Sequence, residues 1–163
     1  MLLPVYNQIK QTLTAITAIK LIDWFNAQYD GIIHTSPCIF IEFPEQLNFQ
    51  TLSRDVQQAE LKIGIHLVSK VMSAQDKSID EASIAAHDVN CNEIYKLIQG
   101  KRDNTGDWLQ YNSLNRTGYR HYHDLQGWFV TVQDFECMIY QKSVKDMITI
   151  ARPEVVVSSH VTI

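Results

Sequence analysis

The chain has 163 residues, of which 45% are hydrophobic and 20% are charged, and its formal net charge is −4. This length suits one domain with a substantial core, and the composition is that of a globular protein rather than a disordered one. The negative charge argues against a dedicated duplex-DNA binder, because such proteins usually carry a basic stripe.

The cysteines limit the redox and metal chemistry of the chain. Their number is odd, and Cys38, Cys91 and Cys137 form no C-x-x-C pair, so neither a disulfide framework nor a zinc knuckle is expected. We expect three buried apolar side chains. The N-terminus shows no secretion signal, and no apolar stretch approaches the roughly 20 residues that cross a membrane. The sequence therefore predicts folding in a reducing cytoplasm.

The first predicted element is a helix. Its apolar stripe consists of Val5, Ile9, Leu13 and Ile16, and Pro4 suits a first helical turn. We expect this helix to end near residue 18 and an edge strand to follow over residues 19–26. Residues 38–43, which Pro44 closes, predict a mostly buried strand.

The clearest strand covers residues 59–68, where apolar and polar residues alternate. One face carries Leu61, Ile63, Ile65 and Leu67. This alternation is typical of an antiparallel sheet with one covered face. A slip of one residue would expose all four side chains, so this strand sets the register of the sheet.

A second helix is predicted after the polar segment 73–78. Its core-facing stripe, spaced three and four residues apart, consists of Ile84, His87, Cys91, Ile94 and Ile98. Ser78 or Asp80 can cap its start, and Gly100 can end it in a left-handed conformation. A thiol and an imidazole one turn apart could form a catalytic pair. Because both lie on the core-facing stripe, we expect a buried, hydrogen-bonded His87 instead.

Two further strands are predicted over residues 119–123 and 128–140, with a turn over 124–127. The second has large apolar side chains on both faces, so we expect a central strand or one that a second surface covers. A ring of neighbouring subunits could supply such cover. Residues 141–163 change character and end in an extended, β-branched stretch. We expect an arm that docks on a neighbouring subunit, and a disordered or self-docked tail is the alternative.

The order of these elements predicts the fold class. Helix, strands, helix and strands indicate one α+β domain over residues 1–140, with an antiparallel or mixed β-sheet packed against two helices. Residues 141–163 form the extended C-terminal arm.

One metal-ligating pattern stands out. His121 and His123 point to the same face of a predicted strand, and Asp124 follows them. A further ligand would be needed, and nothing in the sequence identifies it. The polar face of a hairpin is the simpler interpretation, so we expect no metal, no cofactor and no enzymatic activity, with these three residues as a weak metal candidate.

Aromatic residues outside the helical stripes favour an interaction protein. They lie at predicted strand ends or loops, where exposed aromatics are typical of interfaces. The candidate subunit interface, including the arm, consists of Trp24, Phe25, Tyr29, Trp128, Val155, Val156 and Val157. Packing within the chain is the alternative.

Several segments together support a resemblance. After the N-terminal helix, residues 19–28 precede Ser-Pro-Cys-Ile-Phe-Ile-Glu-Phe at 36–43, and then come the strand 59–68, the helix 83–98 and Phe-Glu-Cys-Met-Ile-Tyr at 135–140. Over residues 1–140 this order resembles the tail-terminator (tail-completion) proteins of long-tailed bacteriophages and prophages. Related neck and tail-tube proteins share parts of the pattern. The family has no catalytic residues to carry over.

The resemblance implies a structural role at the head-proximal end of a virion tail, after synthesis in the host cytoplasm. Such proteins cap the tail tube as a ring, usually a hexamer, and form the head–tail joint with the head-connector proteins. Their partners would be further copies, the tail-tube protein and the connector, with no membrane, and DNA would only pass through the lumen. An acidic chain would suit that passage. The alternatives are another neck or tail protein, or a small cytoplasmic metal-binding domain or enzyme.

Overall fold

The computed structural model describes residues 2–27, 35–71, 78, 80–103, 110–125 and 128–142, and the side chains of 123–125 are left aside. Its elements in chain order are α1 (Leu2–Leu13), β1 (Leu21–Trp24), β2 (Cys38–Glu42), β3 (Gln50–Ser53), β4 (Val56–Lys70), α2 (Glu81–Ile98), β5 (Asn115–Leu125) and β6 (Trp128–Lys142). Within the described residues the strands form one sheet in the order β1-β2-β4-β6-β5, and β3 pairs with β4. Only β1 and β2 run parallel. The predicted α+β fold is confirmed, and its sheet is mixed.

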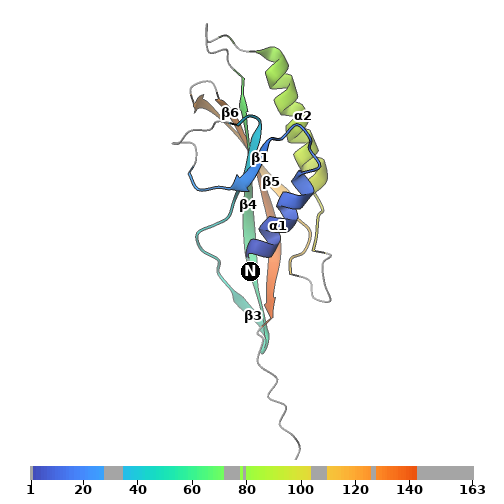
Figure 1. The fold of residues 1–163 in the computed structure, drawn as a ribbon. Coiled ribbons are helices and arrows are strands. Elements are labelled where there is room, and N and C mark those ends of the chain that lie inside the picture. Colours follow the sequence, from blue (N-terminus) through green and yellow to red (C-terminus); the bar gives the residue numbers. More distant parts are fainter. Residues whose placement is uncertain are drawn as a thin grey trace, which may run out of the picture.

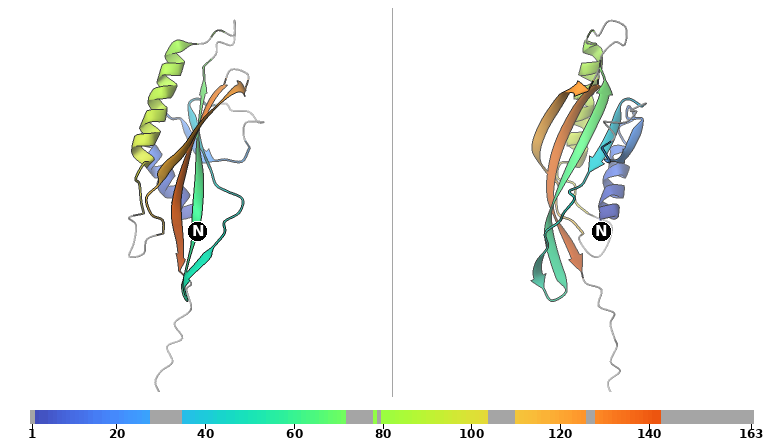
Figure 2. Two further views of the ribbon diagram at one scale, coloured as in Figure 1. Left: turned by 180° about the vertical axis from the view of Figure 1, so that it is seen from behind. Right: turned by 90° about the vertical axis from the view of Figure 1, so that its left-hand side faces the viewer.

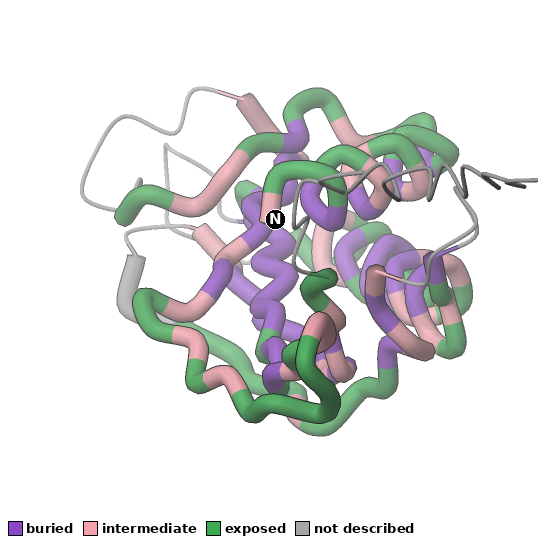
Figure 3. Tube along the Cα trace, turned by 90° about the horizontal axis from the view of Figure 1, so that it is seen from below, coloured by how far each residue is buried: buried purple, intermediate pink, exposed green. Residues whose placement is uncertain are grey.

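Both helices lie on the same face of the sheet, as Figures 1 and 2 show. The buried residues gather between this helical layer and the sheet (Figure 3). The predicted apolar face of β4 is confirmed, because its four side chains at positions 61, 63, 65 and 67 are at most 1% exposed. Burying each such side chain contributes about 1.5–3 kcal/mol. None of the helices in the described part of the chain is both long enough and apolar enough to span a bilayer.

The N-terminal helix is shorter than predicted and ends at Leu13 rather than near residue 18. The hydroxyl groups of Thr12 and Thr14 donate to backbone carbonyls one turn back, and threonine is a weak helix former for this reason. The predicted edge strand is confirmed as β1. Its inward side chain is Ile22, whereas Leu21 is 41% exposed.

The second helix follows its predicted pattern closely. The Asp80 carboxylate accepts a hydrogen bond from the Ala82 N–H at 3.1 Å, which makes it the cap. Gly100 has a φ of +76°, as expected of a left-handed helix end. Asn90 joins the predicted buried stripe, and Ile84 is only half-buried.

The longest pairing joins β4 and β6. All 15 residues of one strand pair with the 15 of the other, from Val56 with Lys142 to Lys70 with Trp128, without a register shift. The strand β6 is therefore central, as predicted, between β4 and β5.

The other face of β6 is also covered, at least around Val130 and Val132. Val130 and Val132 are fully buried within the single chain. They form a second apolar cluster with Cys38, Phe40 and Val68, and Phe25 and Trp128 pack against it. Residues of the chain itself bury this part of the face, so a neighbouring subunit is not needed to cover it.

One end of the sheet projects beyond both helices. It consists of residues 50–58, which include β3 and the start of β4, with residues 140–142 of β6 beside them. Figures 1 and 2 show its turn extending past the end of α1. We call this projection the finger.

Candidate interaction surface

The sheet face opposite the helices, the outer face, has an unusual row of residues across four strands. Glu42 of β2 pairs with Gly64 of β4, Gly64 pairs with Asp134 of β6, and Asp134 pairs with Gly118 of β5. Residues paired in this way lie side by side on the same face. Two carboxylates thus alternate with two positions that have no side chain.

The glycines permit a close approach of these carboxylates to the backbone. A Cβ on Gly118 would lie 2.5 Å from Asp134 Oδ2, and a Cβ on Gly64 would lie 2.9 Å from Glu42 Oε2. Either contact would require a shift of the neighbouring group, so both positions favour glycine.

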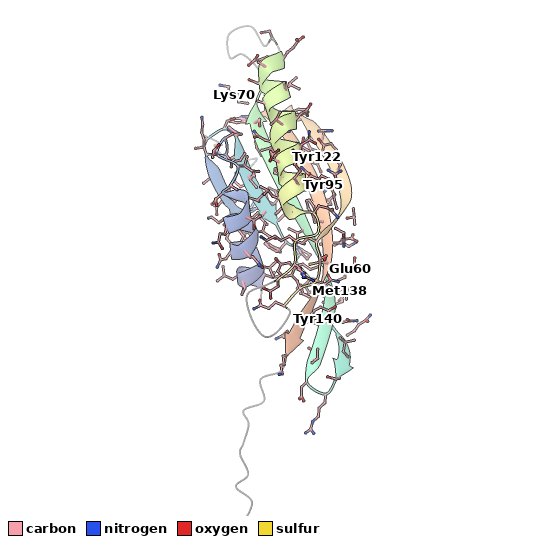
Figure 4. The ribbon with its side chains drawn as sticks, turned by 90° about the vertical axis from the view of Figure 1, so that its right-hand side faces the viewer. Glu60, Lys70, Tyr95, Tyr122, Met138 and Tyr140 are labelled. Carbon is pink, nitrogen blue, oxygen red and sulfur yellow. The ribbon has the colours of Figure 1, made fainter. Side chains whose placement is uncertain are left out.

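The row forms the floor of a groove. Beside Gly64 and Gly118 the groove has a volume of about 410 Å³, with Phe43 and Pro44 on one side. A second hollow of about 350 Å³ continues it toward the finger and shares Pro44 and Lys62 with the first. We call the two together the outer groove. Figure 4 shows Glu60, Met138 and Tyr140 near the finger, at the opposite end of the sheet from Lys70.

The ion pairs of the outer groove leave it acidic. Arg120 donates two hydrogen bonds to Asp134, at 2.8 and 3.1 Å. Lys62 is shared between Glu136 at 3.2 Å and Glu60 at 3.4 Å. When Glu42 and Glu45 are included, the outer groove and its border have five carboxylates and two cations.

A buried histidine does not neutralise Glu42. His66 is 4% exposed, and its Nε2 lies 2.9 Å from Glu42 Oε2. Burial lowers the pKa of His66, and this effect outweighs the nearby carboxylate, which acts in the opposite direction. A neutral imidazole therefore donates to Glu42 and adds no positive charge to the groove.

The aromatic residues predicted for a subunit interface lie at the borders of the two apolar clusters. Trp24 is half-buried and packs between Tyr6 and Phe43, with ring centroids 5.2 and 4.6 Å away. Phe25 stacks on His66 at 4.5 Å. Their place in an interface stays a prediction, as does that of Trp128. The other members of the predicted interface lie outside the described residues, namely Tyr29, Val155, Val156 and Val157.

The structure favours packing over catalysis for His87 and Cys91. His87 is 1% exposed, its Nδ1 lies 2.8 Å from Ser69 Oγ, and its Nε2 lies 2.7 Å from Thr131 Oγ1. Burial lowers the pKa of His87 to about 4. Burial also raises the pKa of the Cys91 thiol, so the pair is a neutral imidazole and a protonated thiol. The expectation of a hydrogen-bonded buried histidine is confirmed.

The weak metal candidate is only partly described. The ring of His121 lies against Phe129, and its Nδ1 is 2.9 Å from Thr131 Oγ1. The side chains of His123 and Asp124 lie outside the described residues. Among the side chains that the structure describes, no group of three or more metal-ligating residues comes together. The three cysteines are all buried and unpaired by disulfides, as predicted.

Sequence reasoning missed the finger and the outer groove. The charged pair Arg54-Asp55, between the polar stretch 50–53 and the strand that starts at Val56, could have indicated a turn. The glycine row had no sequence signal, because it depends on the registers of three strand pairs.

Comparisons with known proteins show a likeness at the level of the fold. No protein-family profile matches the chain, and no curated protein does either. Among solved structures, the chain is similar to a chain from the virion of a native gene transfer agent (GTA) particle, with a TM-score of 0.54 and 10% sequence identity. The likeness covers 81% of this chain and 91% of that one. At this identity, the likeness shows a shared fold.

Proposed function

We propose that this chain is a structural protein of a virion, working by assembly rather than by catalysis. The observation that carries the proposal is the fold shared with a virion chain over most of both lengths. The resemblance of the sequence in element order and short apolar segments supports the same class of protein. One line rests on coordinates and the other on the order of residues along the chain.

Within that class, we propose a tail terminator. Copies of the chain would cap the finished tail tube as a ring, most simply a hexamer, and present a surface to the head connector. The partners would be further copies, the tail-tube protein and the connector proteins. A ring follows when one surface of a subunit binds a different surface of the next and the rotation closes.

The decisive experiment is electron microscopy of particles produced without this chain. We expect tails of uncontrolled length, or finished tails that do not join heads, and restoration by a plasmid-borne copy. Tails of normal length that join heads normally would refute the proposal.

The likeness to a chain of the GTA virion concerns the fold and gives no place within the particle. Another neck or tail protein is therefore the alternative. Immunogold labelling separates the two. Label at the junction of tail and head supports the terminator, and label along the tube or at its far end supports the alternative.

A further inference from the structure

The finger has no hydrophobic core of its own. None of its residues, 50–58 and 140–142, is buried, and all four residues of β3 are exposed. A narrow ribbon of strands without a packed apolar face is only marginally stable in water. Its exposed apolar side chain, Leu52, is 53% exposed. Such an element gains stability when another surface covers it.

The tip of the finger carries a cation. Arg54 is exposed and makes no ion pair with any described residue. Its neighbour Asp55 is half-buried, and Asp55 Oδ1 is fully buried. Arg54 is therefore the more exposed charge of the tip, next to the apolar Leu52.

The outer groove offers the complementary chemistry. Its carboxylates outnumber its cations. Glu42 is paired with the buried His66 rather than with a lysine or arginine, and Glu45 makes no ion pair with any described residue. Gly64 and Gly118 keep its floor open, and Pro44 supplies an apolar side. An arginine beside a leucine matches both parts of this surface.

We propose that the finger of one copy docks in the outer groove of the next copy, with Arg54 against Glu42 and Glu45 and with Leu52 against Pro44. The contacting residues differ on the two copies, since Arg54 and Leu52 lie at the tip of the finger and Glu42, Glu45 and Pro44 line the first hollow. The contact is therefore heterologous and can repeat around a ring. Complementary charge would fix the register of the contact and exclude wrong partners. This inference rests on the proposed ring and names the surfaces that build it.

Cross-linking tests the contact directly. Copies carrying Arg54→Cys are produced together with copies carrying Glu45→Cys, so a bond between the two positions can only join different copies. The native cysteines are buried, which keeps the background low. Mild oxidation of purified virions should give a covalent dimer that reducing agent removes. Lys96→Cys on α2, which belongs to the helical layer, replaces Arg54→Cys as the control and should give none.

Charge exchange tests the energetics. Arg54→Glu or Glu45→Arg alone should lower the amount of this chain in purified virions about tenfold or more, because each change sets like charges against each other. The two together should restore it. Lys96→Glu is the matched control and should leave incorporation unchanged.

Three results would overturn the inference. They are virions that contain both cysteine variants but no cross-linked dimer, a bond from Arg54→Cys to a different virion protein, and single charge reversals that leave incorporation unchanged. If deletion of the chain leaves tails normal, the tail-terminator proposal fails separately. In that case, the same cross-linking experiment on the concentrated, purified full chain tests the contact between copies by itself.

Discussion

Replacing His87 by glutamine should remove much of the acid sensitivity of folding. The imidazole is buried between Ser69 and Thr131, and burial holds its pKa at about 4, against 6.5 for an unperturbed histidine. Of the charged groups nearby, Asp88 raises this pKa and His121 lowers it, and both effects are smaller than that of burial. The folded protein therefore disfavours the protonated ring.

The sign follows from which state binds the proton. At pH values above about 6.5 the ring is neutral in both states, and the full stability is present. As the pH falls from about 6.5 toward 4, His87 binds a proton in the unfolded chain but not in the folded chain. The free energy of unfolding therefore decreases. A pKa difference of about 2.5 corresponds to a loss of about 3 kcal/mol.

The assay is urea unfolding, followed by tryptophan fluorescence between about pH 7.5 and pH 4.5. The glutamine variant will be less stable at neutral pH, since Ser69 or Thr131 loses a partner, so the comparison concerns the change with pH. Over this pH range the wild type should lose about 2.5 kcal/mol more than the variant. His66, whose pKa burial also lowers, contributes equally to both proteins. Parallel losses in the two proteins would refute the reasoning.

Three further predictions concern other features. Gly118→Ala should destabilise the domain by about 1–3 kcal/mol, because its Cβ would collide with Asp134. In an Asp134→Ala background, urea unfolding should give a smaller cost for the same change, and an equal cost would contradict the steric explanation. Gly100→Ala should cost about 1–2 kcal/mol in thermal unfolding, since φ is +76° and no neighbour crowds the site. A thiol reagent should label no cysteine at neutral pH before unfolding, because burial raises the pKa of Cys38 to about 11 and of Cys137 to about 12; fast labelling of the native protein would show an open thiol.

The parts of the fold that sequence could predict are those fixed by local chemistry. The alternation through Ile63 and Ile65 reports burial on one face, and the structure has that face against the helices. The cap at Asp80 and the helix end at Gly100 depend on only a few neighbouring residues. Both helices, the central strand and the buried cysteines followed from such patterns.

The parts that sequence could not predict depend on distant pairings. The outer groove exists because Gly64 and Gly118 both come to lie beside Asp134, and these three residues are far apart in the chain. Val130 is buried together with residues of β2 and β4 and with Phe25. The sequence of β6 by itself therefore does not show which residues cover it. The apolar pattern of β6 correctly required cover on both faces, but a pattern cannot say whether the same chain provides it.

The unbroken pairing of β4 with β6 has a mechanical consequence. Two of the strands in the finger, β4 and β6, continue without a break into the centre of the domain. Near their other ends, Ser69 of β4 and Thr131 of β6 are hydrogen-bonded to His87 of α2. A pull on the finger would therefore pass along both strands into the whole core, rather than peel away a surface loop. A partner bound to the finger would be connected to the two longest strands of the domain. Such a contact would be lost by release of the finger or by unfolding of the domain.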